Sequence, residues 1–337
     1  MQKALIFFTF FFTIIVGFLY YCYHSPEKDI SLETIIEIPE GSSVKTAGKI
    51  LKQNGIINNA NIFYYTVRLL ERDYFVQSGK FVLYKNFGVF RSMEVLRGRP
   101  IIEDIALTIP EGLTVWETAS IAAYVFENVD SAEFVLLCEN REFIEKCGFS
   151  DLLSLEGYLY PETYKFPKNT KSGEIILRMT AMHKKVFSQI SRLPGTKNLT
   201  DEQIVILASV IEKESKVNTE RSHVSGVFYN RLEKKMPLGA DATVRYAVKN
   251  FNRPIRKSEL NSDSPYNTRK FTGLPVGAIC SPSKSSLVAA LNPLETKDLF
   301  FMAKWDGSGE HIFSQTNEQH EKVKSKIKSK NKNLADF

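Results

Sequence analysis

The first clear pattern along the chain is a run of hydrophobic residues at its start. Residues 4–23 contain no charged side chain and follow Lys3. A helix of about twenty apolar residues spans the hydrocarbon core of a membrane. The run exceeds the apolar core of a signal peptide and lacks a small-residue cleavage site, so we expect an uncleaved single-span anchor over residues 1–29. Lys3 before the run, and mixed charges after it, favour a body outside the cytoplasm.

A second pattern is a short segment that occurs twice. IPEGSSV begins at Ile38 and IPEGLTV begins at Ile109, each after a strand-like run and before a helical pattern. In the second copy, Thr114 and Glu117 have the spacing of a capping box. We therefore expect two related α+β units, each built as strand, turn and capped helix. A common turn that occurs twice by chance is the alternative.

The remaining periodicity predicts a fold of mixed class. Between the two turns it indicates a helix over residues 61–70, a β-hairpin over residues 75–88 and a short helix that stops at Gly98. From Ser131 the pattern is mainly helical, including a helix over about residues 201–215, and after residue 236 it becomes rich in loops. We expect an α+β protein with a mainly helical later part and a loop-rich C-terminal part.

The helix that begins near residue 201 ends in two glutamates. Thr200 and Gln203 predict a capping box at its start, and the helix is apolar on nearly all sides. At about 100° per residue, Glu214 lies about 20° from Leu207 around the axis, whereas Glu212 lies roughly 140° away. Glu214 is therefore the one expected to point inward, where apolar surroundings would raise its pKa and suit a proton donor. A partly solvated helix end is the alternative.

Composition and charge exclude several classes of protein. With 43% hydrophobic and 24% charged residues, the chain is globular rather than disordered. Lysines in the tail at residues 321–337 account for much of the net charge of +6, so little favours nucleic acid. The tail is either solvated or in contact with an anionic membrane or polymer. Five histidines without CxxC or HExxH spacing predict no metal site, and Cys138 and Cys147 are either paired or buried free thiols.

Several long motifs occur together and in a definite order. They are EGYLYPETY (156–164), LASVIEKES (207–215), VFYNRL (227–232), DATVRYA (241–247), SPYNTRKFTGLPVGAICSPSKSSLVAALNP (264–293) and FSQTNEQH (313–320). Along nearly its whole length the chain resembles the YceG-like family of endolytic murein transglycosylases, and its IPEG units resemble the LysM-like part of that family. The Glu-Ser pair at the helix end is also similar to a motif of lytic transglycosylases and goose-type lysozymes.

The resemblance implies an enzyme of the bacterial inner membrane, crossing it once, with its catalytic part in the periplasm. Such enzymes cleave the MurNAc–GlcNAc β-1,4 bond within peptidoglycan glycan strands and leave 1,6-anhydro-MurNAc ends. This activity would end strand elongation beside peptidoglycan synthases, and it needs no cofactor. The implied domains are a LysM-like domain at residues 30–100 and a YceG-like catalytic domain at residues 101–337, which includes the second IPEG unit at residues 101–130.

In the resemblance, the catalytic glutamate of the family falls on Glu214. It would protonate the glycosidic oxygen and then, as a carboxylate, take the proton of the sugar's C6 hydroxyl, so a second carboxylate is not required. Many family members have proline where this chain has Ala242 and Val276. The motifs supply candidate substrate-binding residues with hydroxyl, amide, carboxyl, aromatic or backbone donor groups: Glu156, Tyr158, Tyr160, Glu162, Ser215, Asn230, Arg231, Asp241, Thr243, Tyr266, Asn267, Thr268, Gly273, Leu274 and Pro275.

Each of these assignments has a structural alternative, and two other functions stay open. The tyrosine rings equally suit packing, and Arg231 equally suits an ion pair. Ser281 and Lys284 have the S-x-x-K spacing of penicillin-binding serine acylases, although S-D-N and K-T-G are missing. A non-catalytic protein that holds glycan through LysM-like units is the second rival. It would bind glycan whether or not Glu214 is intact.

Overall fold

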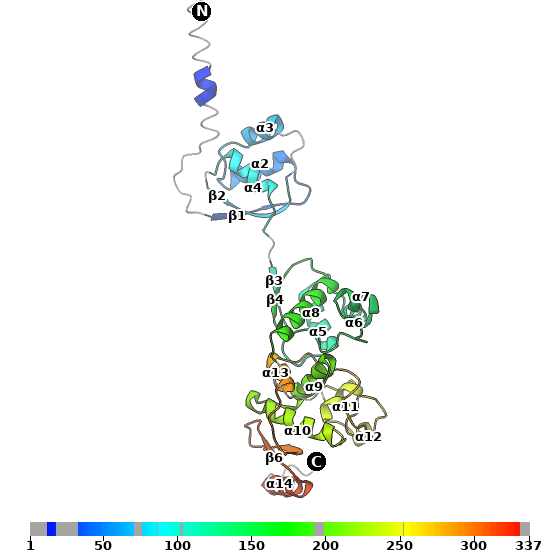
Figure 1. Cartoon of the computed structure of the whole chain (residues 1–337). Coiled ribbons are helices and arrows are strands. Elements are labelled where there is room, and N and C mark those ends of the chain that lie inside the picture. Colours follow the sequence, from blue (N-terminus) through cyan, green and yellow to red (C-terminus); the bar gives the residue numbers. More distant parts are fainter. Residues whose placement is uncertain are drawn as a thin grey trace, which may run out of the picture. The chain divides into compact units, whose positions relative to one another are not determined.

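The computed structural model describes residues 12–17, 33–70, 76–85, 87–101, 104–191, 199–251 and 253–330. The chain divides into two compact units, Met1–Glu103 and Asp104–Phe337 (Figure 1). Both contain helices and small antiparallel sheets, which confirms the mixed α+β class. The assignment of a LysM-like domain and a catalytic domain to these parts stays a prediction.

In its described part, the first unit packs helices on a two-stranded sheet. The strands pair antiparallel with Ile36 opposite Phe81, and both side chains are buried. Leu51, Phe63 and Leu96 complete the core from the helices, one from each. The elements are β1 (Glu33–Ile38), α2 (Val44–Gln53), α3 (Ala60–Leu70), β2 (Gly79–Tyr84) and α4 (Val89–Arg97).

The predicted helices of this unit are confirmed, but the predicted hairpin over residues 75–88 is wrong. Helix α3 covers the expected segment, and α4 ends before Gly98. The alternating residues form the single strand β2, whose partner is β1. Alternation shows that one face of a strand is buried, but it does not identify the strand that pairs with it.

The proposed membrane anchor at residues 4–23 lies outside the described residues except for residues 12–17, which are helical. Among the residues that the structure describes, no helix combines the length and apolar character that crossing a membrane requires.

In its described part, the second unit surrounds α9 with other helices. Strand β3 pairs antiparallel with β4, and β5 pairs antiparallel with β6. The thiols of Cys138, Cys147 and Cys280 are free and buried. The elements are β3 (Asp104–Thr108), α5 (Val115–Val125), α6 (Ser131–Glu139), α7 (Arg141–Lys146), β4 (Thr163–Pro167), α8 (Ser172–Ser188), α9 (Asp201–Glu214), the 3-10 helix η1 (Asn218–Glu220), α10 (Arg221–Glu233), α11 (Asp241–Ala247), α12 (Lys257–Leu260), α13 (Lys284–Leu291), β5 (Phe300–Ala303), β6 (His311–Ser314) and α14 (Asn317–Lys330).

Both IPEG segments form the predicted strand, turn and capped helix. The turn glycines, Gly41 and Gly112, have φ values of 72° and 75°, a conformation that glycine adopts without steric cost. Ser43 caps α2 through the backbone N–H of Thr46, whereas Thr114 caps α5 in a full capping box. The two copies therefore share local structure, although their strands have different partners.

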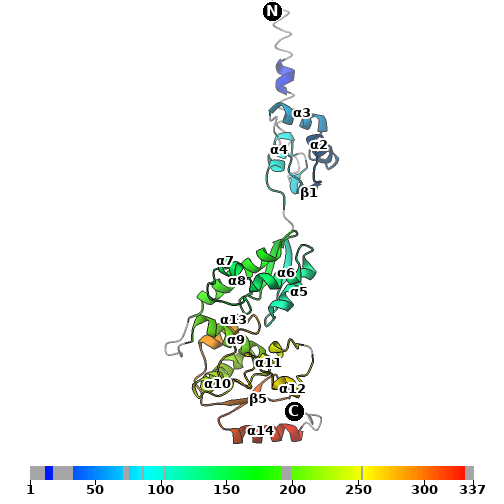
Figure 2. The same cartoon turned by 90° about the vertical axis from the view of Figure 1, so that its right-hand side faces the viewer.

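Helix α9 is the centre of the second unit. Its Thr200 capping box is present, and all residues from Ile204 to Ile211 are buried. Helices α10, α11 and α13 pack against it (Figure 2). Such a helix is apolar all round because protein covers every side of it. The predicted helix is thus confirmed, and its C-terminal end brings both glutamates to the junction with α10, α11 and α13.

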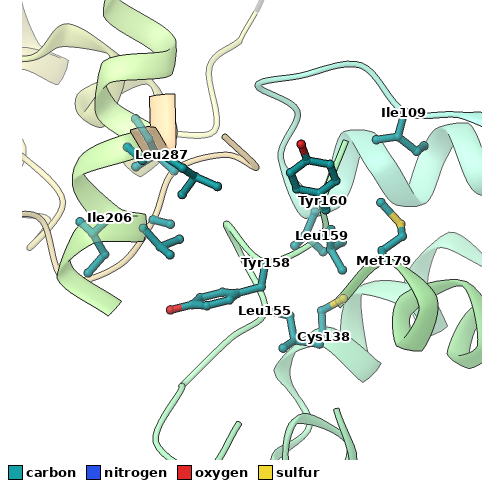
Figure 3. Close-up of a cluster of buried hydrophobic side chains, with 14 of the residues drawn as sticks. Ile109, Cys138, Leu155, Tyr158, Leu159, Tyr160, Met179, Ile206 and Leu287 are labelled. Atoms are coloured by element: carbon teal, nitrogen blue, oxygen red, sulfur yellow. The ribbon is translucent and has the colours of Figure 1, made fainter. Parts of the chain in front are cut away.

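A second part of the core joins α9 to the segment before β4. Tyr158, Leu159 and Tyr160 extend from this segment among buried side chains that include Leu155 and Ile206 (Figure 3). Tyr158 packs edge-on against Phe149 with 4.8 Å between ring centroids. The aromatic residues of the EGYLYPETY motif are therefore mainly core residues.

We predict that Gly226→Ala destabilises the second unit. A Cβ at this position of α10 would lie 2.3 Å from the carbonyl oxygen of Leu294. Overpacking of this kind costs about 2 kcal/mol of unfolding free energy, although alanine favours a helix. Chemical denaturation of the variant measures the loss. Ser120→Ala on the exposed side of α5 is the control, with a change below about 0.5 kcal/mol. An unfolding free energy unchanged by Gly226→Ala would contradict the contact.

Candidate active site

The two glutamates at the end of α9 have different surroundings. The side chain of Glu212 is only 7% exposed and forms an ion pair with Arg221, with 3.1 Å between Oε1 and Nη2. Its Oε2 also accepts the backbone N–H of Ser283 at 2.9 Å and the hydroxyl of the same residue. Helical geometry favoured Glu214 as the inward-facing glutamate, and the structure buries Glu212 as well. A buried carboxylate is tolerated at position 212 because its charge is paired and its oxygens are hydrogen-bonded.

The Glu212 contacts connect three elements. Arg221 begins α10, and Ser283 is the N-cap of α13, so one carboxylate fixes the end of α9 to the starts of two other helices. Lys213 donates to the carbonyl of Gly112, and the backbone N–H of that glycine donates to Ser281. The second IPEG turn is thus attached to the same helix end.

Glu214, the last residue of α9, lies in a different electrostatic environment. It is partly buried and accepts a hydrogen bond from the backbone N–H of Ala242, near the start of α11. Burial raises its pKa to about 7, and the charge of Asp241 acts in the same direction. The guanidinium groups of Arg231 and Arg269 oppose this shift by stabilising the carboxylate.

Buried threonines position the backbone N–H that meets Glu214. The hydroxyl of Thr243 donates to the carbonyl of Ala240 at 2.7 Å and lies 2.9 Å from the hydroxyl of Thr268. Thr268 accepts the backbone N–H of Ala240 at 3.1 Å. These contacts fix the start of α11. The hydroxyls of Thr243 and Thr268, two candidate substrate-binding residues, are therefore hydrogen-bonded within the protein.

Among the candidate substrate-binding residues, Arg231 is the one whose positive charge acts on Glu214. Its Nε donates to Leu299 and its Nη1 to Leu238, both backbone carbonyls, at 2.6 and 2.7 Å. These bonds orient the guanidinium while its charge still acts on Glu214. Its neighbour Asn230 donates instead to the carbonyls of Thr296 and Asp298, at 2.8 and 3.0 Å, and so holds a loop.

The acidic residues of the EGYLYPETY motif have other partners. Glu156 is 5% exposed and accepts the N–H of Val115, the first residue of α5, and the hydroxyl of Tyr246. Burial raises its pKa to about 8. Glu162 is exposed, and its carboxylate accepts the N–H of Thr163. Tyr160 is 9% exposed and belongs to the core.

The remaining candidates build the loop between α12 and α13 or the end of α9. Asn267 donates to the carbonyls of Leu260 and Ser262, and Tyr266 packs 4.8 Å from Tyr246 between ring centroids. Ser215 donates to Val217 as α9 ends. In Gly273, Leu274 and Pro275, the glycine has a φ of 93°, the leucine is half-buried and the proline is buried.

Sequence reasoning missed three residues near the two glutamates. Arg269 pairs with Asp241 at 2.6 Å, and its charge reaches Glu214. Arg221 pairs with Glu212 from the following helix. Glu111 of the second IPEG turn has its pKa raised by burial and by the charge of Glu212. No local sequence signal identifies these residues, because tertiary packing brings each of them to its partner.

The arrangement is suited to proton transfer by one carboxyl group. A pKa of about 7 allows Glu214 to give and take a proton near neutral pH. Glu212 is held by its ion pair, and Asp241 is paired with Arg269. Among the described residues, no group of three or more His, Cys, Asp and Glu side chains has the arrangement of a metal site.

We predict that Glu214→Gln stabilises the protein more at pH 8 than at pH 5. The unfolded carboxyl ionises near its ordinary pKa of 4.5, and the folded one near 7, so the parent loses stability as the pH rises through this interval. Glutamine lacks this loss. Its advantage should increase by ~2 kcal/mol, less than the full linkage value because Glu214 is partly exposed. Urea unfolding at both pH values tests this, and a pH-independent difference would contradict the raised pKa.

We predict a strong coupling between Glu212 and Arg221 in a double-mutant cycle. Removing either partner alone, as in Glu212→Gln or Arg221→Gln, should cost about 3 kcal/mol because it leaves a buried group without its counter-charge. The double variant should cost less than the sum of the two. The matched control is the exposed pair Arg141–Glu145, which has the same 3.1 Å separation and a coupling below about 0.5 kcal/mol. Equal coupling in the two cycles would refute the structural role of the buried pair.

Comparison with known proteins identifies relatives over most of the chain. The model of the YceG-like family matches residues 36–326. An endolytic murein transglycosylase of Bacillus subtilis (strain 168) is 34% identical over 319 residues, which cover 90% of this chain and 88% of that protein. An endolytic murein transglycosylase of Streptococcus pneumoniae serotype 2 (strain D39 / NCTC 7466) is 28% identical over 318 residues, covering 85% of this chain and 57% of that protein.

A solved structure is also similar. The crystal structure of a YceG-like protein from Listeria monocytogenes aligns with a TM-score of 0.58 and 30% sequence identity. The alignment covers 86% of this chain and 98% of that one. The family match and the Bacillus relative both extend over most of the chain. This chain therefore belongs to the YceG-like family.

Proposed function

We propose that this chain is a lytic transglycosylase that cleaves peptidoglycan glycan strands at internal MurNAc–GlcNAc β-1,4 bonds, with Glu214 as its acid and base. The observation that carries the proposal is the partly buried Glu214 carboxyl with a pKa of about 7. Membership of the YceG-like family, and relatives named endolytic murein transglycosylases, support the substrate class.

The reaction proceeds through a single carboxyl group. Protonated Glu214 donates its proton to the glycosidic oxygen as the bond from that oxygen to C1 of MurNAc breaks, and the GlcNAc leaves as an alcohol. The Glu214 carboxylate then takes the proton of the MurNAc C6 hydroxyl, and the C6 oxygen bonds to C1. The product carries a 1,6-anhydro ring, and Glu214 is protonated again. Water is not consumed, which distinguishes this route from hydrolysis by two carboxylates.

The charges around Glu214 suit both halves of this cycle. Burial and the negative charge of Asp241 favour the protonated acid that the first step needs. Arg231, Arg269 and the N–H of Ala242 stabilise the carboxylate that the first step leaves behind. With a pKa of about 7, the protonated and ionised forms of Glu214 have similar populations near neutral pH.

The proposed site of action rests on the sequence of the first part of the chain. The proposed anchor at residues 4–23 would hold the protein in the inner membrane of the bacterium, with the second unit in the periplasm. There the enzyme would cut strands as peptidoglycan synthases extend them, and the LysM-like unit would hold the glycan. The support for this arrangement is the uncharged apolar run and the family resemblance of the IPEG units.

The serine acylase alternative is disfavoured by the position of Ser281. Its side chain is completely buried, and its hydroxyl has no hydrogen-bond partner within the described chain. Lys284 is exposed at the start of α13. A nucleophile needs access to its substrate and a base within hydrogen-bond reach. The non-catalytic binder stays an outcome of the following experiment.

We predict that the full chain releases anhydro-ended glycan fragments from purified peptidoglycan and that Glu214→Gln releases none. Glutamine keeps the size of the side chain but cannot donate or accept the proton, so we expect no detectable release, a fall in rate of at least about a hundredfold. Mass spectrometry of the released glycans measures both products and rates. The rate of the parent should fall as the pH rises above about 7, where Glu214 is deprotonated.

The control is Glu127→Gln, an exposed carboxyl beyond the end of α5, which should keep the parent's rate. Reducing-ended fragments would show hydrolysis and overturn the transglycosylase chemistry. Glycan bound but uncut by both the parent and Glu214→Gln would instead favour the binding protein.

A further inference from the structure

Glu156 is a buried carboxyl group that the proposed reaction does not use. It lies in the segment before β4, and its side chain contacts residues of two helices, α5 and α11. Each of its oxygens lies 3.2 Å from the backbone nitrogen of Val115, and Oε2 accepts the hydroxyl of Tyr246 at 3.1 Å. Burying a carboxyl group is costly even when its oxygens are hydrogen-bonded, so its presence between two helices requires an explanation.

The backbone beside Glu156 is fixed against α9, the helix that carries Glu214. Gly157 has a φ of 90°, and a Cβ at this position would lie 2.5 Å from Ala278 and 3.0 Å from Val205 of α9. Glycine allows the chain to approach the helix this closely because it has no Cβ. The Glu156 carboxyl is therefore held in a fixed position relative to α9.

Helix α11 needs contacts of this kind because it is short. It has 7 residues, Asp241–Ala247, and a helix of this length is not stable without tertiary contacts. Its start is held by the buried threonines. Tyr246 follows Ala242 by about 6 Å along the helix axis. The bond from Tyr246 to Glu156 thus fixes the other end of α11, one turn from the N–H that meets Glu214.

Aromatic packing holds the ring of Tyr246 independently of this bond. The ring centroid lies 5.3 Å from that of Trp116 in α5 and 4.8 Å from that of Tyr266 in the loop before α13. A ring packed between two others stays in place when its hydroxyl is removed. The substitution Tyr246→Phe therefore isolates the polar contact with Glu156 from the packing of the ring.

The surroundings of Glu156 favour its neutral form. Burial raises its pKa to about 8, and the charge of Glu117 acts in the same direction, although the N–H of Val115 and the hydroxyl of Tyr246 stabilise the carboxylate. Glu156 is therefore mainly protonated at pH 7. A protonated carboxyl group both accepts and donates hydrogen bonds, and the side-chain amide of glutamine has the same capacity.

We propose that Glu156 is a positioning residue: through the Tyr246 hydroxyl it holds α11 so that the N–H of Ala242 faces Glu214. It acts through α11 rather than on the glycan. Without this contact, α11 would lose one of its anchors, and the hydrogen bond from Ala242 to Glu214 would weaken. The carboxylate that the first step of the reaction leaves behind would then be less stable. The effect on the rate rests on the proposed function, whereas the effect on the Glu214 carboxyl does not.

The pKa of Glu214 tests this contact without reference to cleavage. It is measured by NMR on the full chain, isotope-labelled at the glutamate carboxyl carbons, in which the Glu214 signal is the one missing from Glu214→Gln. We expect Tyr246→Phe and Glu156→Leu each to raise the pKa of Glu214 by about 0.5, because a weaker hydrogen bond stabilises the carboxylate less. Glu156→Gln should keep the parent's value, since glutamine can bond to both Val115 and Tyr246.

The matched control is Tyr164→Phe, which also removes a buried hydroxyl. Tyr164 lies in β4 and donates to the carbonyl of Tyr160 at 2.7 Å, so its bond does not involve α11. Its loss should lower the thermal stability to a similar extent and leave the pKa of Glu214 unchanged. An unchanged Glu214 pKa in Tyr246→Phe would overturn the proposal, and so would an equal rise in Tyr164→Phe. Because Tyr246→Phe keeps the packed ring, it decides the question even if Glu156→Leu fails to fold.

Digestion of purified peptidoglycan separates this proposal from the proposed function. At pH 6, where Glu214 is mainly protonated, we expect Tyr246→Phe to release anhydro-ended glycans about threefold more slowly than the parent, and Glu156→Gln to release them at the parent's rate. Release by the parent, with the Glu214 pKa unchanged in Tyr246→Phe, overturns the positioning role and leaves the transglycosylase intact. A raised Glu214 pKa without release from any of these proteins supports the contact and overturns the transglycosylase.

Discussion

The buried ion pair between Glu212 and Arg221 is the interaction on which the candidate active site depends. Both side chains are 7% exposed, and the Glu212 carboxylate also accepts two hydrogen bonds from Ser283. A carboxylate so placed cannot turn toward solvent without leaving a buried cation unpaired. The pair therefore fixes the end of α9 against the starts of α10 and α13, and Glu214 follows two residues later on the same rigid helix.

The two glutamates lie on the same helix end but have different electrostatic surroundings, and therefore different roles. Glu212 has a guanidinium and two donors within hydrogen-bond distance, so its negative charge is compensated. Glu214 receives one backbone N–H, and the guanidinium groups near it are partly neutralised by Asp241 or bonded to carbonyls. A paired carboxylate gives structure, whereas a partly compensated one can exchange its proton. The last turn of α9 thus carries both, two residues apart.

The structural features predicted correctly from the sequence are those that depend on interactions between residues close together in the chain. The capping boxes of Thr114 and Thr200, the repeated turn and the apolar helix α9 are all found, because each depends on residues a few positions apart. The hairpin over residues 75–88 failed, since the partner strand β1 is far away in sequence. Several candidate residues were chosen from the motifs by the chemistry of their side chains. The structure bonds Thr243, Thr268 and Asn230 to the protein itself, and the surroundings that decide this come from distant segments.

The two IPEG turns have the same backbone conformation but different neighbours. Within the part of the chain that the structure describes, and apart from the two adjoining residues, no heavy atom lies within 4 Å of a Cβ built at Gly41. One built at Gly112 would lie 3.5 Å from Glu212 and 3.8 Å from Lys213. The first turn is constrained by its φ angle alone, and the second by its φ angle and its neighbours together. Over evolutionary time, residues around the first turn are free to diverge independently. A substitution around the second must also be compatible with Glu212 and Lys213 at the end of α9, so the same short segment tolerates change differently in its two settings.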